Sequence, residues 1–309
     1  RDSSIIHLSG MKQKEIQGTA GLEGLIITMI WDTYTKENDM FFLLQKEDKY
    51  NYLDLETFIV KDILEHNKFM DEYIFYSKDD FVIDEPCEYP EYIKQAIPVG
   101  TIDFVEAWLY RFHKIDCINP IEIPPCLRKE EFQKREYRIV RKENLPTAGR
   151  IFFKDASRLK VFSGEINCET FFTDDLWKPK QNDFDTTLHL DPEHLFQVSE
   201  IVNIGSEYRI YIQDNIIQAI ANYNGDPCLL PDVKLLQKMI NIYSMQYDCP
   251  KAYTMDIAVN EKGTFLLEIH PWIAVGLYNS LWSRNLLYAY RDGIQYVLDF
   301  NTKIEEWNN

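Results

Sequence analysis

Residues 253–272, YTMDIAVNEKGTFLLEIHPW, constrain the fold of this chain more than any other stretch. Two runs of mostly apolar residues flank a short polar turn, and this pattern predicts a β-hairpin. Asp256, Glu268 and His270 interrupt the apolar runs. Ionisable groups inside apolar strands are costly unless they are paired or bound to something. The stretch therefore predicts a hairpin that carries a polar site.

The turn of this hairpin can be formed in two ways, and the choice decides which side chains share a face. A three-residue loop over 261–263 places Gly263 where a positive φ is wanted. It sets Asp256 directly opposite Glu268, and His270 shares their face because side chains alternate along a strand. A two-residue turn would shift the register by one and separate the acids. Gly263 favours the first form.

Two opposed carboxylates repel each other, so a cation should lie between them. A lysine or an arginine would serve, and so would a divalent metal. Carboxylates combined with substrate phosphates are the usual ligands of Mg²⁺. The competing interpretation is an exposed edge hairpin with a solvated acidic face, and these residues alone leave both open.

The composition bounds the fold and its partners. The chain has 309 residues, of which 45% are hydrophobic, enough for two or three subdomains with a sizeable core. Its net charge of −17 would repel nucleic acid and anionic membranes, so neither is expected as a partner. The first apolar stretch, 22–31, is too short to span a bilayer and lacks a signal-peptide cleavage pattern. The six cysteines lack metal-like spacing, which favours reduced thiols and a cytoplasmic location.

The first part of the chain reads as an α/β unit, because strand and helix patterns alternate. Strands are expected at 22–31, 40–44 and 72–76, and a helix at 55–69. A further helix should begin after Thr101, a plausible N-cap. Three prolines within 120–125 exclude a helix or a central strand and mark the best domain boundary.

The second part predicts short antiparallel strands, a polar loop at 178–189 and two helices. The strands are expected at 135–140, 149–155, 159–166, 194–202, 206–212 and 216–223. A helix should start at Pro231 and Asp232. Its apolar stripe would be Val233, Leu236, Ile240, Tyr243 and Tyr247. The last helix follows the hairpin.

Several charged residues before the hairpin are candidates for binding a phosphate. Lys154 ends one apolar strand and Lys160 begins the next. A phosphate-binding lysine needs such a rigid base and a mobile loop that closes over the anion. Lysines at strand ends are also commonly plain solvated residues. The covalent K-x-D-G motif of nucleic-acid ligases is absent, because Lys154 is followed by D-A-S. Glu207 and Arg209 share one strand face, either as an ion pair or as a ribose and phosphate contact.

The order of these features resembles the ATP-grasp superfamily over roughly 127–309. A lysine-bearing strand precedes an acid with two hydrophobic residues, then E-x-R, then a strand Asp followed twelve residues later by E-x-H-P. The segments IPVGTIDFVEAWL and EIHPWIAVGLY are similar, more narrowly, to a bacterial and phage clade named for one arginine and two lysines. The resemblance implies a mixed fold of the α+β (α/β) class, with two α+β subdomains that grip ATP. It divides the chain into an N-terminal α/β domain at 1–125, a lid subdomain at 126–198 and a metal-binding subdomain at 199–309.

The resemblance also implies a role for each matched residue. Lys154 and Lys160 would contact the phosphates. Glu200, Ile201 and Val202 would contact the adenine, and Glu207 would bind the ribose. Arg209 would lie toward the γ-phosphate or the substrate carboxylate. Arg209 and Lys160 are therefore the candidate catalytic residues. Asp256 and Glu268 would hold Mg²⁺, with His270 at the third metal position and Glu268 bridging two ions.

Three departures from the family pattern stand out. His270 replaces a common asparagine and is a softer ligand, which suits Mn²⁺ better than Mg²⁺. The lid holds only Gly164 in place of a glycine-rich loop. The family's first lysine has no clear counterpart, and Arg135, Arg138 and Arg141 stay open as replacements.

The implied reaction is ATP-dependent ligation of a carboxylate with an amine or a thiol. It passes through an acyl phosphate, gives ADP and phosphate, and would act on an amino acid or a peptide. Such chemistry needs in-line placement and charge neutralisation more than covalent help. The alternatives are a weakly active ATP-binding module that works through partners and a kinase on the same fold. Trp272, Tyr278 and the helix after Thr101 are candidates to line the substrate pocket, although side chains of this kind more often belong to the core.

Overall fold

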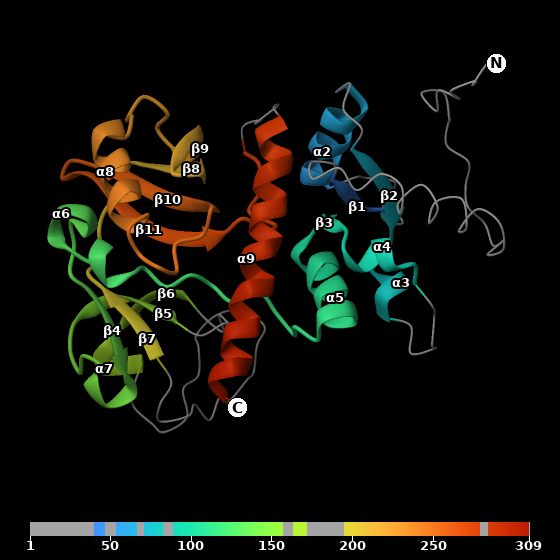
Figure 1. The fold of residues 1–309 in the computed structure, drawn as a ribbon. Coiled ribbons are helices and arrows are strands. Elements are labelled where there is room, and N and C mark those ends of the chain that lie inside the picture. Colours follow the sequence, from blue (N-terminus) through green and yellow to red (C-terminus); the bar gives the residue numbers. More distant parts are fainter. Residues whose placement is uncertain are drawn as a thin grey trace, which may run out of the picture.

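The computed structural model describes residues 40–46, 54–66, 71–82, 89–156, 163–171, 195–278 and 284–308. Three sheets and a long helix, α9 (Arg284–Asn308), organise these residues. Helix α9 runs between the N-terminal unit and the two other sheets (Figure 1). The expected strand at 22–31, the expected loop at 178–189 and Lys160 lie outside the described residues.

The N-terminal unit is a parallel α/β unit, as the sequence predicts. Its strand order is β2-β1-β3, and β1 pairs in parallel with both neighbours. The strands are β1 (Phe41–Gln45), β2 (Glu72–Tyr76) and β3 (Ile97–Val99). The helices are α2 (Leu55–His66), α3 (Asp79–Val82), α4 (Glu91–Lys94) and α5 (Ile102–His113). Helix α5 begins after Thr101, as expected, and buries Phe104, Val105, Trp108 and Leu109.

A linker and a small antiparallel sheet follow. The proline-rich linker forms a 3₁₀ turn, η1 (Pro125–Leu127), and one bridge from Ile121 to Ile269. The sheet order is β4-β7-β5-β6, and its small core is centred on Phe153, Phe196 and Val198. Its strands are β4 (Tyr137–Arg141), β5 (Arg150–Asp155), β6 (Ser163–Asn167) and β7 (Leu195–Ser199). Short helical segments are α6 (Glu130–Gln133), η2 (Lys142–Asn144) and α7 (Cys168–Phe171).

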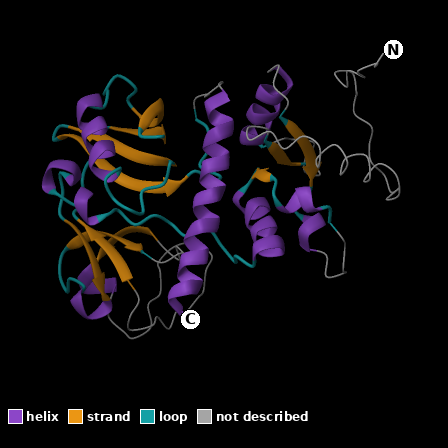
Figure 2. Ribbon diagram, viewed as in Figure 1, coloured by secondary structure: helices purple, strands orange, loops and turns teal. Residues whose placement is uncertain are grey.

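The third sheet is antiparallel, with order β11-β10-β8-β9, and α8 (Val233–Tyr243) packs against it (Figure 2). Its strands are β8 (Ser206–Gln213), β9 (Ile216–Gly225), β10 (Ala252–Asn260) and β11 (Gly263–Pro271). Helix α8 starts where expected, because the Asp232 carboxylate caps the N–H groups of Lys234 and Leu235.

The apolar stripe of α8 differs from the expected one. Leu236, Met239, Ile240 and Tyr243 are the buried residues of the helix. Val233 is 53% exposed and Tyr247 is 89% exposed, so their assignment to the core is wrong. Tyr247 lies beyond the end of the helix at Tyr243, and Met239 completes the i, i+3, i+4, i+7 face instead.

Helix α9 shares one apolar core with the N-terminal unit and with the sheet that contains β8. Its residues Leu287 and Tyr290 share that core with Phe42 of β1 and with Tyr211 of β8. Trp272 is fully buried there, which favours the core interpretation of this residue over a place in the substrate pocket. No helix in the described ranges is both long and apolar enough to cross a membrane.

Gly293 lies where α9 crosses Trp272, and an added Cβ atom would lie 2.3 Å from the Trp272 carbonyl oxygen. We expect Gly293→Ala to lower the free energy of unfolding by about 1–3 kcal/mol, because the backbone must shift. Alanine otherwise favours a helix over glycine by about 1 kcal/mol, so the sign is diagnostic. Denaturant titration measures the change, with exposed Gln295→Ala as the control. A Gly293→Ala protein as stable as wild type would contradict the close packing.

Candidate active site

The hairpin reaches its predicted register by a different route. Gly263 pairs with Asn260, so the turn holds two residues and the expected three-residue loop is wrong. A β-bulge then leaves Leu267 unpaired between the Leu266 and Glu268 positions of β11. The extra residue moves Glu268 back opposite Asp256, because a bulge places two residues against one. The predicted opposition of the two acids is therefore confirmed.

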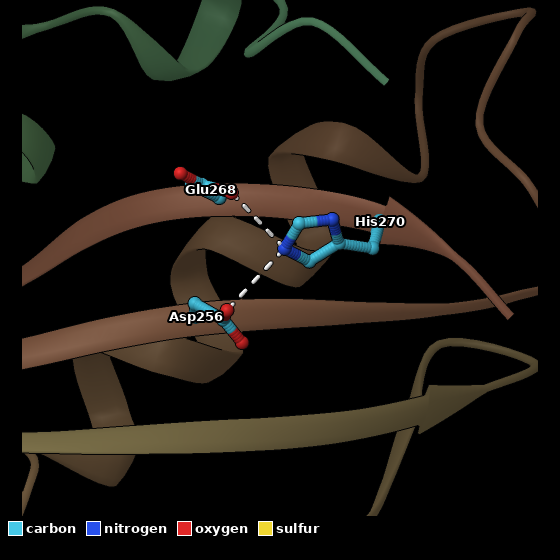
Figure 3. A group of neighbouring side chains, drawn as sticks. All are labelled: Asp256, Glu268 and His270. Carbon is cyan, nitrogen blue, oxygen red and sulfur yellow. Dashed lines mark hydrogen bonds and ion pairs between the residues drawn. The ribbon is translucent and has the colours of Figure 1, made fainter. Parts of the chain in front are cut away.

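His270 lies between these two carboxylates (Figure 3). Its Nε2 atom is 3.3 Å from Asp256 Oδ2 and 3.2 Å from Glu268 Oε2. Burial alone would lower the pKa of His270, but the hydrogen bonds and charges of both acids outweigh it and raise that pKa. One ligand atom from each residue lies within 4.8 Å of the other two, as a metal site requires. These donors fit a divalent cation, which His270 would bind through a neutral imidazole.

The expected cation between the acids is supplied by side chains in this structure. Arg209 makes a bidentate pair with Asp256, with Nε–Oδ1 and Nη2–Oδ2 distances of 2.8 Å. Lys154 Nζ lies 2.6 Å from Glu268 Oε1. Burial disfavours both charged carboxylates, but Arg209 and His270 lower the pKa of Asp256, and His270 and Lys154 lower that of Glu268. Both acids are therefore held ionised, as metal ligands must be.

Arg209 is fixed by aromatic rings as well as by Asp256. Its guanidinium carbon lies 5.1 Å from the centre of the Tyr278 ring and 5.8 Å from that of Tyr223. The two rings are stacked with their centres 5.0 Å apart. Glu207 instead accepts hydrogen bonds from Tyr223 and Asn224. The structural partner of Arg209 is thus Asp256, and not the neighbouring Glu207.

The link after β7 differs from the expected strand. Strand β7 ends at Ser199, so Glu200, Ile201 and Val202 lie in the connection to β8 and not inside a strand. The Glu200 amide donates to the Glu136 carbonyl, and the exposed Glu200 carboxylate lies 3.5 Å from Lys262 Nζ. The strand ends there because the chain must leave one sheet and cross to the other.

A cleft separates the β4-β7-β5-β6 sheet from the hairpin. Its wall on that sheet includes Lys154, Asp155 and Gln197, and its opposite wall is formed by 267–270. The proline-rich segment 120–123 closes a third side. The structure thus brings Lys154, Glu268 and His270 together at the cleft, which also includes Asp155, Gln197 and the linker, none of which the sequence had pointed to. The linker carried a signal only as a boundary, because prolines reveal the absence of regular structure and not what the chain contacts.

Among the three arginines proposed for the missing lysine, Arg135 is the one that contacts the hairpin. It is buried, its Nη1 donates to the Leu266 carbonyl at 3.1 Å, and it lies over the Phe265 ring. Burial lowers the pKa of Arg135 to about 10, although Glu268 acts in the opposite direction. Arg138 and Arg141 are exposed on β4. The geometry therefore favours Arg135.

Two small antiparallel sheets therefore face each other across a cleft that carries Lys154 and acidic side chains. The family comparison is more specific. Residues 129–285, more than half of the chain, match an ATP-grasp domain family, the second family of the clade named for one arginine and two lysines, and the chain belongs to it. The predicted superfamily and the mixed α+β fold are thereby confirmed. A sequence search of curated proteins gives no match.

Solved structures with a similar chain path include three distant examples. D-alanine–D-alanine ligase from Bacillus anthracis, complexed with ATP, is 12% identical with a TM-score of 0.41, over 86% of this chain and 98% of that one. The ATP-grasp ligase PsnB with a minimal precursor is 10% identical with a TM-score of 0.48, over 82% and 100%. A RimK domain ATP-grasp protein from Sphaerobacter thermophilus is 11% identical with a TM-score of 0.44, over 84% and 98%. The family match, and not these likenesses, identifies the chain.

Proposed function

We propose that this protein binds ATP with a divalent cation in the cleft and uses it to ligate a carboxylate to an amine or a thiol. The observation that carries the proposal is the cluster of Asp256, Glu268 and His270, which faces Lys154 of the opposite sheet across the cleft. Membership of the ATP-grasp family supports the choice of nucleotide. The lid at 126–198 and the subdomain at 199–309 would hold it between them.

The roles of the side chains follow from charge and position. Lys154 would exchange Glu268 for a phosphate oxygen, and Lys160 would add a second contact from the lid. The link of Glu200, Ile201 and Val202 would meet the adenine, and Glu207 the ribose. Arg209 is held by Asp256 through Nε and Nη2, and its guanidinium would contact an oxyanion once Asp256 binds the metal instead.

The proposed chemistry balances as two displacements. The substrate carboxylate oxygen forms a bond to the γ-phosphorus, and the bond from that phosphorus to the bridging oxygen breaks, which releases ADP. The amine or thiol then attacks the acyl carbon, phosphate leaves, and the nucleophile loses its proton. A bound cation would neutralise charge on the transferring group. Arg209 and Lys160 would hold the transferred phosphoryl group and stabilise its charge, with no covalent step on the protein.

The three side chains that would bind the metal include an imidazole, which favours Mn²⁺ over Mg²⁺. Imidazole is softer than the oxygen ligands that Mg²⁺ prefers, so His270 should shift the preference toward Mn²⁺.

A nucleotide-binding module without turnover is the second candidate function. The ion pairs that occupy Asp256 and Glu268 favour it, because metal binding must first displace them.

Thermal unfolding with and without ATP and each metal tests the site. A ligand at 100 times its dissociation constant should stabilise the folded protein by about 2.7 kcal/mol. We expect this gain in wild type with Mn²⁺ or Mg²⁺, and a much smaller one in Glu268→Gln. Glu261→Gln, at the exposed turn of the same hairpin, is the control. An equal gain in stability in wild type and Glu268→Gln would show that the metal does not bind at the hairpin.

Product analysis then separates the reactions. ADP and phosphate formed only with a suitable carboxylate and amine would support ligation. AMP and pyrophosphate would overturn it, and a stable phosphorylated acceptor would indicate a kinase.

A further inference from the structure

A second buried network joins the N-terminal unit to the segment after β11. Glu56, in the first turn of α2, is buried, and its Oε1 accepts a hydrogen bond from the Gly276 N–H at 2.7 Å. Its Oε2 accepts one from the Tyr290 hydroxyl of α9 at 2.5 Å. Glu56 therefore connects two segments that are more than 200 residues away along the chain. A buried carboxylate is costly unless it is hydrogen-bonded, and these two contacts offset part of that cost.

The segment that Glu56 holds is fastened on its other side by β8. The Tyr211 hydroxyl donates to the Gly276 carbonyl at 2.6 Å, and the Tyr278 N–H donates to the Tyr211 oxygen at 3.1 Å. Gly276 has a φ of +68°, a conformation that other residues rarely adopt. The Gly276 and Tyr278 amides are thus fixed by side chains from other elements, one of them from the N-terminal unit.

The fixed turn leads to the metal cluster through Arg209. The Tyr278 ring lies over the Arg209 guanidinium, which forms the bidentate pair with Asp256. A Cβ atom on Gly276 would lie 3.7 Å from Arg209 Nη1, so the turn itself also packs near the guanidinium. A continuous series of contacts therefore runs from Glu56 through the turn to Arg209 and Asp256.

We propose that Glu56 is a positioning residue for the nucleotide site: it holds the turn at 276–278 against Arg209, so that metal–ATP affinity depends on the docking of the N-terminal unit. The inference rests on the proposed function for its binding readout. Glu56 itself touches neither the metal cluster nor the cleft wall, and it acts through Gly276 and Tyr278.

The protonation of Glu56 gives this contact a distinctive pH dependence. Burial raises the pKa of Glu56 to about 7, against the opposing hydrogen bonds from Tyr290 and Gly276. The other charged or titratable groups around it are Asp54 before its own helix, Arg209 and Tyr211 of β8, and Tyr290 of α9. An ionised Glu56 accepts both hydrogen bonds with its full charge, whereas a protonated one resembles glutamine. The hydrogen bonds from Gly276 and Tyr290 should therefore be strongest above pH 7, even though ionising this buried acid lowers the stability of the fold as a whole.

Calorimetric titration with Mn²⁺ and ATP at pH 6 and pH 8 tests the proposal on the full chain. We expect Glu56→Gln to bind roughly tenfold more weakly than wild type at pH 8, a typical coupling between sites. At pH 6 the two should bind alike. Comparison of the two proteins cancels the titration of ATP and His270. Glu65→Gln, at the exposed end of the same helix, is the matched control and should bind like wild type at both pH values.

A nucleotide-free readout keeps the test decisive. Hydrogen exchange of the Gly276 and Tyr278 amides should be faster in Glu56→Leu, which has no acceptor, and unchanged in Glu65→Gln. Tyr290→Phe keeps the carboxylate and covers the case that Glu56→Leu does not fold, with a smaller rise in exchange expected. Unchanged exchange in folded variants, or an equal affinity ratio at both pH values, would overturn the proposal. Failure of wild type to bind would instead overturn the proposed function, and the exchange data would still decide the role of Glu56.

Discussion

Arg209→Met is expected to lower the free energy of unfolding by about 3–5 kcal/mol, because it leaves the buried Asp256 carboxylate without its bidentate partner. Methionine keeps much of the side-chain volume and the contact with the Tyr223 and Tyr278 rings, so the loss reports mainly on charge. His270 remains as a weaker partner, at 3.3 Å. Denaturant titration in metal-free buffer measures the change.

Two comparisons make this result specific. Arg150→Met removes an exposed ion pair with Glu165, which should contribute no more than about 1 kcal/mol. Adding Asp256→Leu to Arg209→Met should recover part of the loss, since apolar replacement of a whole buried pair is often neutral. A loss below about 1 kcal/mol for Arg209→Met would show that solvent or His270 already satisfies Asp256.

The sequence predicted the opposed acids correctly but for an incomplete reason. Alternation placed Asp256 and Glu268 on one face only if the turn had three residues. The structure forms a two-residue turn and then inserts Leu267 as a bulge, which restores the register. A bulge has little sequence signal when the inserted residue is as apolar as its neighbours. The sequence pattern determined which face of the hairpin carries the polar side chains. The backbone reaches that arrangement through the bulge and not through the turn length.

Long-range pairing marks the limit of sequence reasoning at this site. The spacing of Glu207 and Arg209 suggested a local ion pair, but Arg209 binds Asp256, which lies 47 residues further along. Lys154 was proposed from its place at a strand end, yet its partner Glu268 depends on how two separate sheets face each other. Glu56 gave no signal at all, because an acid in the first turn of a helix is ordinarily a solvated group that favours the helix dipole. Secondary structure depends on local periodicity, whereas the burial of a charge depends on the whole fold.

Glu56→Gln is expected to remove a pH dependence of the free energy of unfolding that we expect in wild type between about pH 4.5 and pH 7. The pKa of Glu56 rises from its ordinary value of 4.5 to about 7 on folding, so the folded protein binds this proton more tightly than the unfolded chain. The stability contributed by the protonated group is fully present below pH 4.5 and is lost as pH rises through 7. A shift of that size corresponds to about 3 kcal/mol.

The free energy of unfolding, measured by denaturant titration from pH 4.5 to pH 8, tests this prediction. Wild type should lose about 3 kcal/mol over this range relative to Glu56→Gln, while Glu65→Gln should follow wild type. His270 also titrates with a raised pKa, but it is present in all three proteins and cancels in the differences. Tyr290→Phe removes a hydrogen bond that lowers the pKa of Glu56, so it should extend the loss to higher pH. If the free energy of unfolding changes with pH in the same way in wild type and Glu56→Gln, the Glu56 pKa is ordinary. The pH dependence expected for the hydrogen bond between Glu56 and Gly276 would then be absent as well.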